Sequence, residues 1–164
     1  NLCFGSKKNR FNHYDISWNY RYTNIQAALG ISQLKRINKI IKKKHEIGNY
    51  YYNNFKNIEN IILQPNKLSY CKNIYWVFGI VLKRNNKNNI SSVIKKLASN
   101  NIGTRPFFWP MHKQDAFKKK NYFKNISLPN SEFISKNGFY LPSGLGLTRT
   151  ELKFIKDTLI RILK

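Results

Sequence analysis

WNYRYTNIQAALG, residues 18–30, joins a polar and aromatic cluster directly to a helical pattern. Asn19 carries amide donors and Arg21 a guanidinium fork, and aromatic side chains surround both. Thr23 or Asn24 can cap a helix, because each has a side-chain oxygen that accepts from free backbone N–H groups. Free N–H groups at a helix start also favour an anion. The residues alone leave two interpretations open, an anion-binding loop and a capping loop packed with its own tyrosines.

The helical pattern continues well beyond this stretch. Apolar or small residues recur at helical spacing at Ile25, Ala28, Leu29, Ile37, Ile41, Gly48, Tyr52 and Phe55. This spacing predicts one helix from about Asn24 to about Asn57, which is long for a globular protein. Residues 1–22 show no lasting period and are predicted to form a loop.

Strand and helix patterns alternate in the rest of the chain. Predicted strands or extended segments cover residues 74–82, 102–112 and 139–147, and a short apolar piece at 61–63 precedes a break at Pro65. The segment 102–112 is predicted to be an edge strand or a loop, because Pro106 and Pro110 lack an N–H donor. Predicted helices cover residues 90–101, 132–138 after a Ser131 cap, and the end of the chain after Thr148, with a weakly helical or disordered segment over 115–125 and a loop over 84–89. The order predicts an α/β arrangement, a small sheet covered by helices.

The formal net charge of +23 is extreme for 164 residues. It is typical of proteins that bind nucleic acid or another polyanion. The basic residues are spread along the chain, however, and Lys, Asn and Ile are abundant throughout, as AT-rich coding sequence favours. We therefore interpret the charge mainly as a coding bias. The two cysteines, Cys3 and Cys71, show no metal-binding or disulfide spacing, which favours a reducing compartment.

A second stretch, GTRPFFWPMH over residues 103–112, concentrates aromatic and polar side chains between prolines. Aromatic rings with a few polar groups suit a sugar or a nucleotide. The alternative is an aromatic edge of the core with a surface arginine. The three histidines and seven acids show no metal-ligand or acid–base pairing elsewhere.

Four blocks, read together, resemble the DegT/DnrJ/StrS sugar aminotransferases, and perosamine-synthase-like members in particular. They are WNYRYTNIQAALGISQLKRI (18–37), YWVFGIVL (75–82), NIGTRPFFWPMHKQDAF (101–117) and GFYLPSGLGLT (138–148). The blocks stand in the family's order and span nearly the whole chain.

The resemblance implies the C-terminal part of a type I, aspartate-aminotransferase-like α/β fold. In that fold a long interdomain helix leads into a small α/β domain with a small, mainly antiparallel sheet. Residues 1–22 would end the large domain that binds pyridoxal phosphate, as an interface loop. Residues 23–57 would form the interdomain helix, and residues 58–164 the small C-terminal domain.

The resemblance also implies a reaction and its partners. The family uses pyridoxal 5'-phosphate to move an amino group from an amino acid, usually glutamate, to a nucleotide-linked keto-sugar, for amino-sugar or cell-surface polysaccharide biosynthesis. It implies a homodimer whose active site is shared across the interface, and the two cysteines make the cytoplasm the expected compartment. Neither a membrane nor nucleic acid is an implied partner, and no metal is implied.

Site residues follow from the matched motifs. Asn19 matches an asparagine that reaches the cofactor phosphate of the neighbouring subunit, and Arg21 matches the arginine of the same motif near that interface. The loop from Arg105 to His112 resembles the segment that lines the sugar-nucleotide entrance. Substrate contacts are therefore expected from Arg105, Phe107, Phe108 and His112.

The family's Schiff-base lysine lies upstream of the Asn-Tyr-Arg motif. The resemblance therefore implies no catalytic residue within this chain, and we expect a fragment that does not transaminate by itself. Two alternatives stay open: a basic domain that binds nucleic acid or another polyanion, and a catalytically dead remnant of an aminotransferase.

Overall fold

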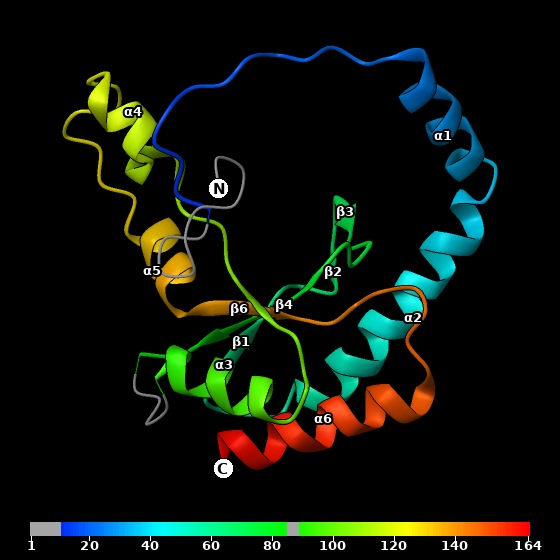
Figure 1. Ribbon diagram of the computed structural model, residues 1–164. Helices are drawn as coiled ribbons and strands as arrows, with labels where there is room; N and C mark the ends of the chain where they lie inside the picture. Colours follow the sequence, from blue (N-terminus) through cyan, green and yellow to red (C-terminus); the bar gives the residue numbers. More distant parts are fainter. Residues whose placement is uncertain (1–10, 85–88) are drawn as a thin grey trace.

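The computed structural model of the chain describes residues 11–84 and 89–164. Most of the predicted loop over 84–89, Cys3 and the first ten residues of the predicted opening loop lie outside this description. Figure 1 shows the elements in order. They are α1 (Asn24–Leu34), α2 (Ile37–Phe55), β1 (Ile61–Leu63), β2 (Lys67–Leu68), β3 (Cys71–Lys72), β4 (Phe78–Leu82), α3 (Ile90–Ser99), β5 (Arg105–Pro106), the 3-10 turn η1 (Met111–Lys113), α4 (Asp115–Lys119), α5 (Pro129–Asn137), β6 (Gly138–Leu141) and α6 (Arg149–Leu163).

The central sheet has four strands in the order β1-β4-β6-β5, and every pairing in it is antiparallel. Ile80 in β4 lies opposite Leu63 on one side and Phe139 on the other. β5 pairs with β6 alone, so it is an edge strand, as its prolines predict. A small antiparallel sheet is thus the centre of this α/β domain, as expected.

One face of the sheet carries the hydrophobic core. Phe78, Ile80 and Leu82 of β4 alternate into it, beside Phe139 and Leu141 of β6. α2, α3 and α6 pack their buried side chains against this face. From α2, Tyr51 and Phe55 stack with ring centroids 5.8 Å apart, and both lean against Phe78. Burying these rings removes a large apolar area from water, which is the main force that holds the helices to the sheet.

The predicted single helix is interrupted, and this corrects the expected element over residues 24–57. α1 ends at Leu34 and α2 begins at Ile37. The Arg36 N–H bonds to the Gln33 carbonyl at 2.9 Å, three residues back, so the last turn of α1 tightens and leaves the α-helical path. α1 has no buried residue to hold it in line with α2, whereas α2 buries the side chains of Ile47, Tyr51 and Phe55 in the core.

Two predicted helix starts are confirmed and a third is wrong. Thr23 and Thr148 each accept from the N–H three residues on, and Gln26 and Glu151 complete the capping boxes. Ser131, by contrast, caps nothing. α5 already begins at Pro129, because proline has no N–H to lose in a first helical turn.

The predicted strand over residues 74–82 begins later than its composition indicates. Tyr75 has a φ of 51°, a left-handed conformation that breaks the extended path, and β4 starts only at Phe78. The short hairpin of β2 and β3 just before it was not predicted, because two-residue strands of exposed side chains carry no periodic signal.

Gly48 supplies a stability test of the packing between α2 and the Tyr75 loop. A Cβ added at Gly48 would overlap the Tyr75 ring, whereas a Cβ at Gly144 would meet nothing within 4 Å. Gly48→Ala is expected to lower the free energy of unfolding by about 2 kcal/mol or more, although alanine normally favours a helix.

The measurement is chemical denaturation of Gly48→Ala beside the control Gly144→Ala, which should stay close to the parent chain. A Gly48→Ala protein as stable as the control would contradict the close contact between Gly48 and Tyr75.

Candidate functional site

The loop before α1 holds Asn19 and Arg21 open to solvent. The Arg21 N–H donates to Asn19 Oδ1 at 3.0 Å, so the asparagine oxygen shapes the turn. Within the described residues, neither the Asn19 amide nitrogen nor the Arg21 guanidinium has a hydrogen-bond or ion-pair partner. Both groups are therefore available to an anion, immediately before the capped start of α1.

Arg105 projects from the open edge of the sheet. It is exposed, and it lies opposite Tyr140 in the β5–β6 pair, so both residues belong to the face that is turned away from the core. Within the described residues Arg105 has no ion-pair partner. A guanidinium in this position can bind a phosphate or a sugar hydroxyl.

Phe107 packs against the same face of the sheet, edge-on to Tyr140 with an interplanar angle of 80°. Two glycines make room for its ring: a Cβ at Gly79 would lie 2.6 Å from Phe107 Cζ, and a Cβ at Gly138 would overlap the ring. The Phe107 N–H also bonds to the Gly138 carbonyl at 3.0 Å. This placement favours a supporting role for Phe107 in shaping the loop over a direct contact with a substrate.

Phe108, the next residue, turns toward solvent and is 47% exposed. Its ring is parallel to that of Trp76, with an interplanar angle of 5° and centroids 6.2 Å apart. Tyr140 and Phe11 lie against it at 6.4 and 4.9 Å. Phe108 is therefore the centre of an aromatic row on the face of the sheet opposite the core.

His112 is buried, only 7% exposed, in the turn η1. Its Nε2 donates to Glu132 Oε1 of α5 at 2.9 Å, and Lys113 Nζ lies 3.2 Å from the same oxygen. These hydrogen bonds, that of His112 first, hold the pKa of Glu132 below its ordinary value. His112 thus fastens the loop to α5, and its burial favours a positioning role over direct substrate contact.

The opening segment is bound to the residues after this turn. Gln114 donates to the Phe11 carbonyl at 2.8 Å and accepts from the His13 N–H at 2.8 Å. Asn12 and Asp115 exchange two further bonds, at 2.7 and 3.1 Å. Figure 1 shows the chain leaving the neighbourhood of α4 and running on to α1. No sequence pattern predicts this pairing of residues about a hundred positions apart.

The predicted site residues therefore form two groups that the chain does not join. Within the described part of the chain, no hydrogen bond, ion pair or ring contact connects Asn19 or Arg21 to Arg105, Phe107, Phe108 or His112. Each group is nevertheless set by its own local structure, the first by the turn before α1 and the second by β5, η1 and α5.

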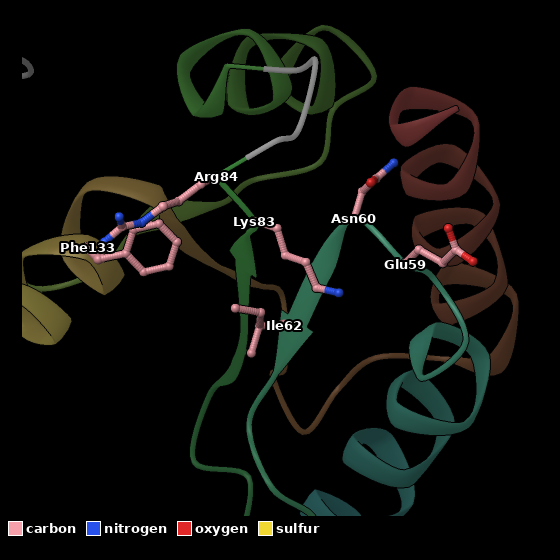
Figure 2. Close-up of a pocket in the computed structure, with 6 residues that line it drawn as sticks. All are labelled: Glu59, Asn60, Ile62, Lys83, Arg84 and Phe133. Carbon is pink, nitrogen blue, oxygen red and sulfur yellow. The ribbon is translucent and has the colours of Figure 1, made fainter.

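A separate cavity of about 720 Å³ lies where β4 ends and β1 begins (Figure 2). Its lining residues are Glu59, Asn60, Ile62, Lys83, Arg84 and Phe133. The Arg84 guanidinium sits 5.2 Å from the centroid of the Phe133 ring, a cation–π contact that holds it against α5. None of the predicted site residues lines this cavity.

The residues that sequence reasoning missed are Trp76 and its supports. The run IYWVFGIVL was interpreted only as a buried strand, yet Trp76 is 64% exposed. No signal in the sequence distinguishes Trp76 from its buried neighbours in this run. Within the described residues, no three His, Cys, Asp or Glu side chains gather as they would around a metal ion, and no helix is long and apolar enough to cross a membrane.

Phe107 and Phe108 are adjacent residues with different expected roles: Phe107 supports the loop, and Phe108 is open to a ligand. Phe107→Ala should lower the free energy of unfolding by about 2 kcal/mol or more, because it empties the space over the two glycines. Phe108→Ala should cost less than about 1 kcal/mol, because half of that ring is already in water. Urea denaturation of both variants measures the difference, and equal losses would contradict the packing of Phe107.

The bond between His112 and Glu132 predicts a pH dependence of stability. The folded-state pKa of Glu132 is lowered, so its contribution is complete above the ordinary carboxyl value of 4.5 and is lost as pH falls through the lowered pKa. The parent chain should melt above Glu132→Gln at pH 7, and the difference should shrink between about pH 5 and pH 2. Glu59→Gln, exposed and outside this contact, is the matched control for the loss of one carboxylate and is melted at the same pH values. A Glu132→Gln difference that is independent of pH would exclude the coupling.

Known proteins share this sequence and fold. The model of the DegT/DnrJ/EryC1/StrS aminotransferase family matches residues 2–160. The chain is 30% identical to the GDP-perosamine synthase of Vibrio cholerae over 146 residues, which are 89% of this chain and 39% of that protein. It is 27% identical over 151 residues to a Campylobacter jejuni UDP-4-amino-4,6-dideoxy-N-acetyl-beta-L-altrosamine transaminase, covering 92% of this chain and 39% of the relative.

Solved structures agree on the fold. Helicobacter pylori PseC, an aminotransferase involved in the biosynthesis of pseudoaminic acid, superposes with a TM-score of 0.76 at 20% identity, over 92% of this chain and 40% of that one. A putative sugar aminotransferase from Streptococcus pneumoniae gives 0.75 at 20% identity, over 87% and 35%. The chain spans about two fifths of the length of the curated relatives it matches. The predicted fold class is confirmed, and the chain belongs to the DegT/DnrJ/EryC1/StrS aminotransferase family.

Proposed function

We propose that the chain is the C-terminal part of an enzyme that transfers an amino group from an amino acid, glutamate in the first instance, to a nucleotide-linked keto-sugar. The products are the 2-oxo acid and the amino sugar, which would serve amino-sugar or cell-surface polysaccharide biosynthesis. The observation that carries the proposal is the family match, which runs from residue 2 to residue 160.

The family implies pyridoxal 5'-phosphate, and the loop before α1 fits one part of that cofactor. The Asn19 amide nitrogen and the Arg21 guanidinium are donors without protein partners in the described chain, and a phosphate needs such donors. When bound, the cofactor supplies an electron sink for the amino transfer. We assign Asn19 and Arg21 to its phosphate and assign no catalytic residue within the 164 residues.

The second group of residues would hold the sugar nucleotide. Arg105 and Phe108 are exposed and are proposed to contact it directly. Phe107 and His112 would act by positioning, because one is packed on two glycines and the other is bonded to Glu132. The predicted substrate contacts are thus divided between residues that touch the ligand and residues that fix the loop.

A second copy of the chain is the proposed partner of α1. Trp18, Ile25, Leu29 and Leu34 are each at least 63% exposed, and α1 buries no side chain of its own. Exposed apolar surface of this kind marks an interface. A dimer that covers α1 would bring the Asn19 loop of one copy toward the other, so the active site would be shared. We propose the cytoplasm as its compartment, because the sequence has two distant cysteines without the spacing of a disulfide framework.

The direct test uses the full-length protein with pyridoxal phosphate, glutamate and a panel of GDP- and UDP-linked keto-sugars. Formation of 2-oxoglutarate together with an amino sugar, followed by mass spectrometry, is the expected result. No amino transfer from any donor would overturn the proposal. Binding to DNA or heparin that weakens steeply with salt would then favour the polyanion-binding alternative suggested by the charge of +23.

Asn19→Ala tests the phosphate assignment. Losing a hydrogen bond to a charged group costs about 1.5–3 kcal/mol, so the affinity for pyridoxal phosphate should fall about tenfold or more, with the dimer intact. Absorbance titration of the cofactor-free full-length protein measures the affinity, and size-exclusion chromatography checks the dimer. Asn53→Ala, an exposed asparagine on α2, is the control and should bind as the parent does. An unchanged affinity in Asn19→Ala would remove that residue from the site.

A further inference from the structure

We propose that Trp76 is a stacking residue for the planar base of the nucleotide-linked sugar. This inference rests on the proposed function and names a residue for one part of its substrate. The indole is 64% exposed, whereas Tyr75 before it and Phe78 two residues after it are almost completely buried. Three features of the structure hold this open ring in a fixed place.

The first feature is the backbone at Tyr75. A bulky aromatic residue with a φ of 51° is a steric outlier, and such a conformation persists only where its surroundings enforce it. Here the Tyr75 N–H donates to Asn73 Oδ1 at 2.7 Å and its hydroxyl donates to Asn66 Oδ1 at 2.7 Å. The ring is also seated against Gly48 and stacked on Phe78. With Tyr75 fixed inside, the chain turns Trp76 outward.

The second feature is a clamp on the Trp76 carbonyl. Lys44 Nζ of α2 donates to this oxygen at 2.9 Å and to the Ser143 carbonyl at 2.7 Å. The Ser143 hydroxyl lies 3.4 Å from the same Trp76 oxygen. Two segments that are distant in sequence therefore hold the backbone of one exposed tryptophan. Such support lowers the entropy that a ligand must remove when it binds.

The third feature is the row of rings beside Trp76. Its ring is parallel to that of Phe108 with centroids 6.2 Å apart, and the indole is still 64% exposed beside this neighbour. Phe108 in turn leans on Tyr140, and Arg105 is the register partner of Tyr140. Open aromatic faces suit a base, and a nearby guanidinium suits the phosphates attached to it.

The test measures the dissociation constants of GDP and UDP with the full-length protein by calorimetry. Trp76→Ala should weaken the better-bound of the two about tenfold or more, the usual effect of removing an aromatic ring from under a base. Inorganic pyrophosphate, which has no base, should bind Trp76→Ala and the parent equally. Tyr70→Ala removes a similarly exposed ring in the β2–β3 hairpin and should leave every affinity unchanged.

Two further variants separate stacking from apolar packing. Trp76→Leu keeps apolar volume without a π face and should be as weak as Trp76→Ala, whereas Trp76→Phe should recover most of the affinity. Full recovery by leucine would overturn the proposal. These variants also serve if Trp76→Ala does not fold.

Other outcomes would also overturn it. Unchanged nucleotide affinity in Trp76→Ala would do so, and if the dimer dissociated at the same time the tryptophan would belong to a subunit contact. A loss seen with the sugar nucleotide but absent with GDP and UDP would place the ring under the sugar. If the parent protein transfers amino groups while Trp76→Ala binds nucleotide as the parent does, the stacking proposal fails and the proposed function stands. A parent that neither transfers nor binds a nucleotide loses both.

Discussion

The close approach of Gly48 to the Tyr75 ring sets the distance between α2 and the loop that leads into β4. Because Gly48 has no side chain, the ring occupies the space that a Cβ would fill, and α2 lies directly over it. From that position Tyr51 and Phe55 reach Phe78, and Lys44 reaches the Trp76 carbonyl. The aromatic core on one side and the exposed tryptophan on the other therefore depend on the same contact.

The two faces of β4 have different uses: one carries the hydrophobic core, and the other carries the loop with the candidate site residues. Phe78, Ile80 and Leu82 point into the core, while Gly79 between them leaves a flat surface on which Phe107 lies. Gly138 does the same in the neighbouring strand. A loop of aromatic residues can therefore rest on the sheet without a thick layer of side chains beneath it. The residues that follow, Phe108 above all, gain a defined position at the surface.

Sequence patterns predicted those features that local chemistry determines. The Thr148 capping box, the amphipathic helix α3 and the edge position of β5 follow from side chains within a few residues of one another. The break at Lys35–Arg36 and the left-handed Tyr75 did not follow. The break reflects α1 having no buried face, and Tyr75 is held by residues from α2 and from the preceding loop. The break follows from missing tertiary contacts along α1 and the Tyr75 conformation from contacts that are present, and no short window of sequence contains either.

The roles of the candidate site residues stay predictions, and the structure adds only where each side chain lies. Resemblance to a family pointed to Asn19, Arg21 and the loop from Arg105 to His112. It did not show which residues of that loop are exposed and which are fixed against the rest of the domain. That division comes from Gly79, Gly138 and Glu132, which lie in other elements. Trp76 was hidden because a tryptophan in a β-rich run resembles any other strand residue.

The hydrogen bonds between residues 11–13 and Gln114 have a mechanical consequence for α1. They anchor the chain at His13, and Thr23 caps the start of α1, so a tether of about ten residues joins the two points. A chain of that length reaches at most about 35 Å when fully extended. The Asn19 turn lies within this tether and shortens it further. A displacement of α1 beyond that reach would pull on the hydrogen bonds of Gln114. The length of the tether therefore limits how far α1 can move away from the loop at His112.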